Sequence, residues 1–149
     1  MGVFNRLANL PARVAAGAFM LNAGLGKISP TDEAATAVHG MATTAYPFLG
    51  QVPPASFTKA LGASEIGLGT ALLLPIVPDG VAGAALTAFS AGLIGLYLRV
   101  PGMRNEGSLR PTQQGTAISK DIWLLALGVS LMTHARSHRT RGRQAAPAD

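Results

Sequence analysis

Charged residues are absent from long stretches of this chain, and those stretches predict its helices. Residues 14–26, 80–98 and 122–133 carry no charge, and only Glu65 is charged between Lys59 and Asp79. Uncharged runs of about 18 or more residues are typical of membrane spans, because roughly 20 residues at a 1.5 Å rise cross the hydrocarbon core. We therefore predict an all-α, antiparallel four-helix transmembrane bundle with spans at about residues 10–27, 57–77, 80–98 and 116–135.

A soluble four-helix bundle is the alternative reading of the same pattern. Its helices would each need a polar face toward water, whereas residues 68–77 and 81–98 are apolar all round. Helices that are apolar all round are buried in protein or in lipid. The pattern therefore favours the membrane bundle.

The segments between the spans predict their connections. Ser29 and Pro30 form a good helix start, as N-cap and first helical residue, and the weakly amphipathic stretch to about Thr44 then predicts an interfacial helix. Residues 78–80 predict a tight turn that makes the second and third spans an antiparallel hairpin. We expect one domain over residues 1–135 and a basic flexible tail over residues 136–149.

Composition strengthens the membrane prediction. The 149 residues are 48% hydrophobic, which is ordinary, but only 13% are charged, about half the usual fraction of roughly a quarter. The chain has no cysteine, which excludes disulfides, thiol relays and cysteine-ligated metals. We expect a multi-pass protein of the cell membrane. Basic residues divide six and six between the two sides, and the dense cluster after residue 135 favours cytoplasmic termini.

Alternating span direction predicts that the ionisable residues meet at one end of the bundle. That end receives the last turns of the first and third spans and the first turns of the second and fourth. Two interpretations stay open: an ion-pair network that locks the bundle, or a pocket in which Arg99 and Lys120 bind an anion and Glu65 orients them. The predicted cluster is Lys27, Glu65, Arg99, Lys120 and Asp121, with Lys59 at the same level.

The opposite end carries Arg13, in the first turn after Pro11. We expect its side chain to reach lipid phosphates, with contact to a partner subunit as the alternative. Small residues at four-residue spacing predict the helix–helix contacts of the bundle. They are Ala12 and Ala16 in the first span, Ala63, Gly67 and Ala71 in the second, and Ala84, Ala88 and Gly92 in the third.

No catalytic or metal centre is predicted. His134 and His138 have a spacing that could bind a metal, but no further ligand lies near them in the sequence. The sequence contains no nucleotide-binding loop or serine nucleophile motif in the structural context that such a motif requires. The arginine-rich C-terminal segment would meet anionic lipid, so we expect no nucleic-acid partner.

Short motifs through most of the chain resemble the DoxX-like membrane proteins, in an actinobacterial-type branch. The similarity implies a four-helix integral membrane protein, of a kind often linked to quinone-coupled or redox-stress oxidoreductase assemblies; the founding members are associated with thiosulfate oxidation. Glu65 stands at the acidic position of the family's second span. The motifs are residues 13–17, 24–27, 48–53, 64–74, 97–104 and 119–123.

Two hypotheses on function follow. The preferred one is a non-catalytic membrane subunit that anchors or couples redox-enzyme subunits, with a homo-oligomer as a further possibility. The other is a small-molecule site for a quinone or a sulfur oxyanion, built on Glu65, Arg99 and Lys120. We expect no intrinsic cofactor, and a quinone is the one to test.

Overall fold

The computed structural model describes residues 2–144, and side chains over residues 9–135. Every regular element in this part of the chain is helical, which confirms the all-α prediction. The helices are α1 (Gly2–Leu25), α2 (Asp32–Ala45), the 3₁₀ helix η1 (Pro47–Gln51), α3 (Pro54–Leu73), α4 (Asp79–Arg99), the short α5 (Thr116–Ser119) and α6 (Ile122–Gln144).

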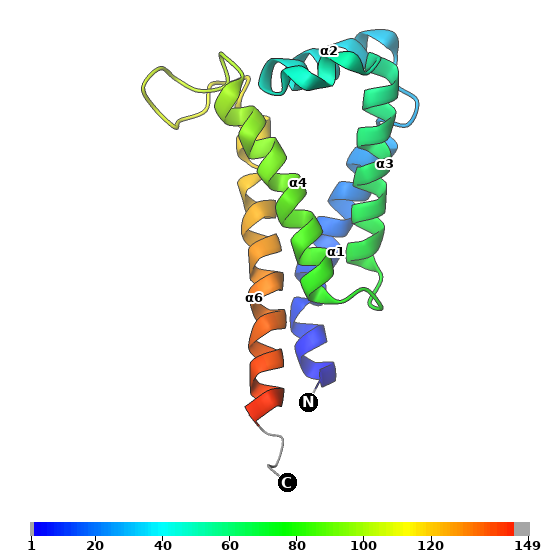
Figure 1. Ribbon diagram of the computed structural model, residues 1–149, viewed down its shortest axis with the longest axis vertical. Coiled ribbons are helices and arrows are strands. Elements are labelled where there is room, and N and C mark those ends of the chain that lie inside the picture. Colours follow the sequence, from blue (N-terminus) through cyan, green and yellow to red (C-terminus); the bar gives the residue numbers. More distant parts are fainter. Residues whose placement is uncertain (1, 145–149) are drawn as a thin grey trace.

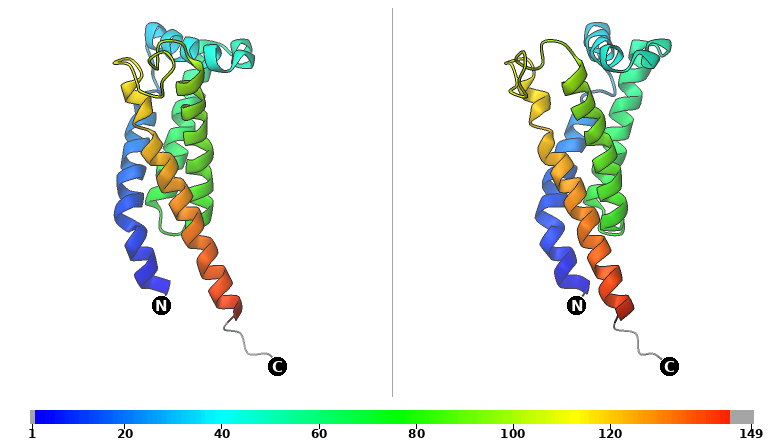
Figure 2. Two further views of the ribbon diagram at one scale, coloured as in Figure 1. Left: turned by 90° about the vertical axis from the view of Figure 1, so that its left-hand side faces the viewer. Right: turned by 60° about the vertical axis from the view of Figure 1, so that its left-hand side comes forward.

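Four long helices, α1, α3, α4 and α6, run along the long axis of the molecule (Figure 1). Helix α2 lies across one end of them, beside the loop that follows α4, and the start of α1 and the end of α6 lie at the other end (Figures 1 and 2). Helix α2 begins two residues later than predicted, because Thr31 and not Ser29 is its N-cap. The Thr31 hydroxyl accepts a bond from the Ala34 amide at 3.2 Å. Threonine fills that role nearly as well as serine.

The long helices associate as two close pairs, α1 with α3 and α4 with α6. Glycines permit the close approach. A Cβ added at Gly24 would lie 2.6 Å from the Gly62 carbonyl oxygen, and one added at Gly83 would lie 2.7 Å from the Gly128 carbonyl oxygen. Gly17 and Gly69 form a third such contact. Backbone therefore packs directly on backbone within each pair.

A narrow core joins the two pairs, and each long helix gives it two residues. The edge of the Trp123 ring also meets Phe19, with ring centroids 5.8 Å apart, and so links α6 to α1. Most of the core side chains are leucine, with two alanines and one methionine. The core residues are Ala16, Met20, Leu68, Leu72, Ala82, Leu86, Leu124 and Leu131.

Many large apolar side chains point outward from the bundle instead of inward. They occur on α1, α4 and α6, and within the described side chains they include Val14, Phe19, Leu25, Val81, Leu98, Ile122, Trp123 and Val129. Two helical segments, Asp79–Arg99 and Thr116–Ala135, are long and apolar enough to cross a membrane. These two segments correspond to the third and fourth predicted spans. Helix α3 corresponds to the second predicted span and is more polar, because it contains Ser56, Thr58, Lys59, Ser64 and Glu65.

Helix α6 continues further than the sequence predicts. It ends at Gln144, so the backbone is helical over 136–144, where a flexible tail was expected. Arginine is a good helix former, and positive charge near a helix C-terminus is favoured by the helix dipole. The rest of the predicted tail, residues 145–149, lies outside the described residues.

Candidate functional site

Arg13 forms many hydrogen bonds at the end of the bundle opposite α2. It is 5% exposed and forms an ion pair with Asp79, the first residue of α4. Its Nε donates to the Leu72 carbonyl at 2.9 Å, Nη1 to Val77 at 3.0 Å, and Nη2 to Ala71 at 2.9 Å and Leu74 at 3.0 Å. With the bond from Nη1 to Asp79, all five N–H donors of the guanidinium are used.

This arrangement caps the end of α3 from a neighbouring helix. The last four carbonyls of a helix lack intrahelical partners, and Arg13 supplies donors to two of them and to two more in the turn that follows. Asn9 adds a bond from its amide nitrogen to the other Asp79 carboxylate oxygen, at 3.1 Å. We call this group, Asn9, Arg13 and Asp79, the lower clamp.

The lower clamp corrects the expectation for Arg13. The sequence predicted a side chain that reaches lipid phosphates, but the guanidinium points into the bundle and has no free donor for a phosphate. Its partners lie more than 50 residues away in sequence, beyond the reach of a local motif. One signal was available: alternating spans place Arg13 and Asp79 at the same end of the bundle, as opposite charges.

At the other end, Lys27 and Glu65 form the second ion pair. Lys27 Nζ donates to both carboxylate oxygens of Glu65, at 3.0 and 2.8 Å, and to the Ala23 carbonyl at 3.1 Å. The Glu65 side chain is 7% exposed and that of Lys27 is 26% exposed. Glu65 faces α1 because the glycines at 62 and 69, on the same side of α3, bring α1 close. Asp121 lies near enough for the charges of Lys27 and Glu65 to act on its carboxylate.

The other two members of the predicted cluster lie elsewhere. The Arg99 guanidinium stands over the Tyr46 ring, 5.0 Å from its centroid, and Nη1 donates to the Ala45 carbonyl at 3.4 Å. The Tyr46 hydroxyl donates to the Gly92 carbonyl at 2.8 Å. Both contacts tie α4 to the end of α2. Lys120 is exposed, and no ion pair to it is found among the described side chains.

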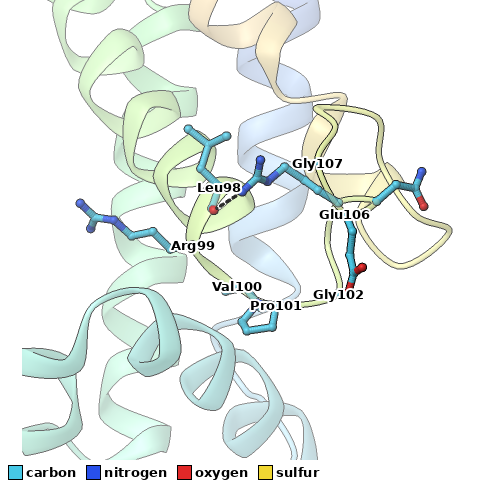
Figure 3. A pocket seen from close by; sticks show the side chains of 9 residues that line it. Leu98, Arg99, Val100, Pro101, Gly102, Glu106 and Gly107 are labelled. Carbon is cyan, nitrogen blue, oxygen red and sulfur yellow. Dashed lines mark hydrogen bonds between the residues drawn. The ribbon is translucent and has the colours of Figure 1, made fainter.

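Arg99 also borders an open hollow of about 290 Å³ at the end of α4. Figure 3 shows its side chain pointing away from the loop, on the side opposite Glu106. Across the hollow, Arg104 donates to the Leu98 carbonyl at 2.9 Å. The residues that line the hollow include no nucleophile and no pair of facing carboxylates. The guanidinium groups of Arg99 and Arg104 bond to backbone carbonyls, and that of Arg99 also contacts the Tyr46 ring.

A second hollow, of about 330 Å³, is an apolar groove between α3 and α4. Its lining is mostly small: Ser64, Gly67, Leu68, Ala71, Ala85 and Phe89. The predicted small-residue contacts need correction here. Ala63, Gly67, Ala84, Ala88 and Gly92 are exposed, and a Cβ added at Gly67 or Gly92 would meet nothing within 4 Å. The buried contacts use other glycines on the same helices.

The site residues thus form two closed ion pairs and one cation–aromatic contact, and none of them presents a reactive group to a cavity. Lys27, Glu65 and Asp121 are brought together, Arg99 and Lys120 are not, and Arg13 belongs to the lower clamp. No family model, curated protein or solved structure matches the chain.

Proposed function

We propose that the protein is a multi-pass protein of the cell membrane, in which α1, α3, α4 and α6 cross the bilayer. Outward-facing apolar side chains on α1, α4 and α6 and the two long apolar segments support this. The internal ion pairs support it as well, because a charge at membrane depth is costly unless it is paired. In this arrangement α2 lies at one interface and both termini lie on the cytoplasmic side.

The role that the geometry favours is that of a non-catalytic subunit that packs against other membrane helices. The observation that carries it is the exposed row of small residues on α3 and α4, with the apolar groove between them. Lipid gives helices little reason to associate unless small residues allow close backbone approach. Gly67 and Gly92 leave such an approach open on the outer surface.

The resemblance to DoxX-like proteins supports an oxidoreductase assembly as the partner. A site for a quinone or a sulfur oxyanion on Glu65, Arg99 and Lys120 has less support, because Glu65 is bonded to Lys27, just after α1, and Arg99 contacts the end of α2. Two of the three charged groups on which that site would depend, those of Glu65 and Arg99, are therefore engaged with different helices.

Gentle detergent purification of matched variants tests this role. Gly67→Leu fills the exposed small-residue face, and Ala126→Leu makes the same kind of change on the exposed face of α6. We expect redox-enzyme subunits to copurify with the unchanged chain and with Ala126→Leu, and to be lost with Gly67→Leu. Equal retention by both variants contradicts a partner on the α3–α4 face. Purified protein that carries a bound quinone or oxyanion, and no subunits, favours the other function.

A further inference from the structure

The turn between α3 and α4, residues 74–78, has an unusual surface for the end of a helical hairpin. All five side chains are apolar: Leu74, Pro75, Ile76, Val77 and Pro78. Ile76 is 81% exposed, the largest exposure among the described large apolar residues, and Leu74 is also exposed. A turn that faced water would normally carry polar side chains.

The lower clamp bonds several of the polar groups that would otherwise favour contact of this turn with water. Carbonyls of Ala71, Leu72, Leu74 and Val77 accept bonds from Arg13. The only charge at the turn, on Asp79, is neutralised by the same guanidinium. Backbone groups left without a partner are what excludes irregular chain from an apolar layer, at several kcal/mol each. The clamp satisfies four carbonyls of this region, those of Ala71, Leu72, Leu74 and Val77, from within the protein.

Helix α6 shows where the turn lies relative to the charged end of the molecule. A Cβ added at Gly80 would lie 3.3 Å from the Ala135 Cβ, so α6 passes the turn at Ala135. Beyond that point the helix continues to Gln144, and α1 likewise extends past the turn (Figure 1). The α6 extension holds arginines at positions 136, 139, 141 and 143, a basic cluster suited to anionic phosphates. The turn is therefore on the membrane side of that cluster.

We propose that the turn over residues 74–78 is a lipid-contact surface that lies beneath the phosphate layer, with Ile76 among the acyl chains and the lower clamp as the device that permits it. The occupant of this surface is the acyl chain of a phospholipid. This inference rests on the membrane arrangement proposed above and adds that the hairpin stops short of the aqueous phase on this side.

Site-specific labelling tests the depth of Ile76, and the lack of cysteine in the chain makes single labels straightforward. Ile76→Cys, Val129→Cys and Gln113→Cys are each labelled with an environment-sensitive fluorophore in vesicles of phosphatidylcholine with a minority of phosphatidylglycerol. Spin labels on the acyl chain, spin labels on the headgroup, and aqueous iodide serve as quenchers. Val129 is a lipid-facing control on α6 and Gln113 an exposed loop control.

We expect the label at 76 to lose fluorescence to acyl-chain quenchers, as at 129, and to resist iodide, which quenches the label at 113. Quenching at 76 by iodide to the extent seen at 113 overturns the proposal, and so does protection from both lipid and iodide, which would place a protein on the turn. If the label at 129 also escapes acyl-chain quenchers, the membrane arrangement itself fails. Asp79→Asn in the Ile76→Cys chain should shift the label toward iodide; an unchanged depth overturns the role of the lower clamp.

Discussion

Arg13 lies within α1 and Lys27 just after its C-terminal end, and each is paired with a carboxylate far along the chain. Arg13 reaches Asp79 at the start of α4, and Lys27 reaches Glu65 within α3. Burying a charge is costly, and removing one partner leaves the other uncompensated. These four side chains therefore fix how α1 sits against the hairpin.

Replacement of Arg13 should strongly destabilise the isolated protein. Arg13→Ala leaves Asp79 with Asn9 alone and four carbonyls without their donor, so we expect a loss of about 3–5 kcal/mol in unfolding free energy. Arg13→Lys keeps the charge but offers three donors in place of five, and should lose less. Thermal unfolding in one detergent measures both. If Arg13→Ala unfolds at the temperature of the exposed-site variant Lys59→Ala, the clamp does not stabilise the fold.

Replacement of Lys27 should distinguish a structural ion pair from a binding site. Lys27→Met leaves the buried Glu65 beside Asp121 with no ammonium group, and we expect a loss of a few kcal/mol in stability. The double variant Lys27→Met, Glu65→Leu should recover most of that loss, because an apolar pair can replace a buried ion pair. Retention of partners by the double variant would agree with a structural role. A double variant no more stable than Lys27→Met would contradict it.

The sequence places Lys27 and Glu65 in one predicted cluster, without naming them as a pair, and it does not predict the role of Arg13. Alternating helix direction and the glycines around Glu65 are enough to bring Lys27 and Glu65 to one level and one side. The bonds of Arg13 go to carbonyls at the end of α3 and in the turn before α4, and the hydrophobic pattern does not specify the backbone shape of that turn. Arg99 left the predicted cluster because the side of α4 on which it lies faces Tyr46 of the α2 end.

At the scale of the helices, α3 carries small residues on two faces, one packed against α1 and one exposed on the outside of the bundle. Gly62 and Gly69 face α1, while Ala63 and Gly67 face outward. In α4, Gly83 faces α6 and Gly92 is open. Both faces have the spacing that allows close helix contact, so spacing alone predicts that contacts exist but not which face is used inside the molecule.

Paired glycine substitutions should separate these faces. Gly24→Ala places a Cβ 2.6 Å from the Gly62 carbonyl oxygen and should force α1 and α3 apart, at a cost of about 1–3 kcal/mol. Gly67→Ala meets nothing within 4 Å and should be neutral, or stabilise by up to about 1 kcal/mol through helix propensity. Thermal unfolding of the two variants in the same detergent provides the comparison. Equal stability of the two would mean that α1 and α3 do not meet at Gly24.

For the whole molecule, the pattern of uncharged runs predicts the long helices and the hairpin, and it predicts the end at which α2 lies. What it does not predict is the division into two close pairs, because that depends on direct contacts such as Gly83 against Gly128. The resulting bundle has a narrow core of alanine and leucine and an apolar exterior. An exterior of this kind is stable where lipid, not water, is the solvent.

Extraction of the expressed chain from cell membranes directly tests the proposal that lipid surrounds its long helices. We expect the protein to remain in the membrane pellet through an alkaline carbonate wash and to enter solution only with detergent, because Val14, Phe19, Val81 and Val129 are exposed on its long helices. Release by carbonate, followed by a compact monomer in detergent-free buffer, would contradict the membrane arrangement.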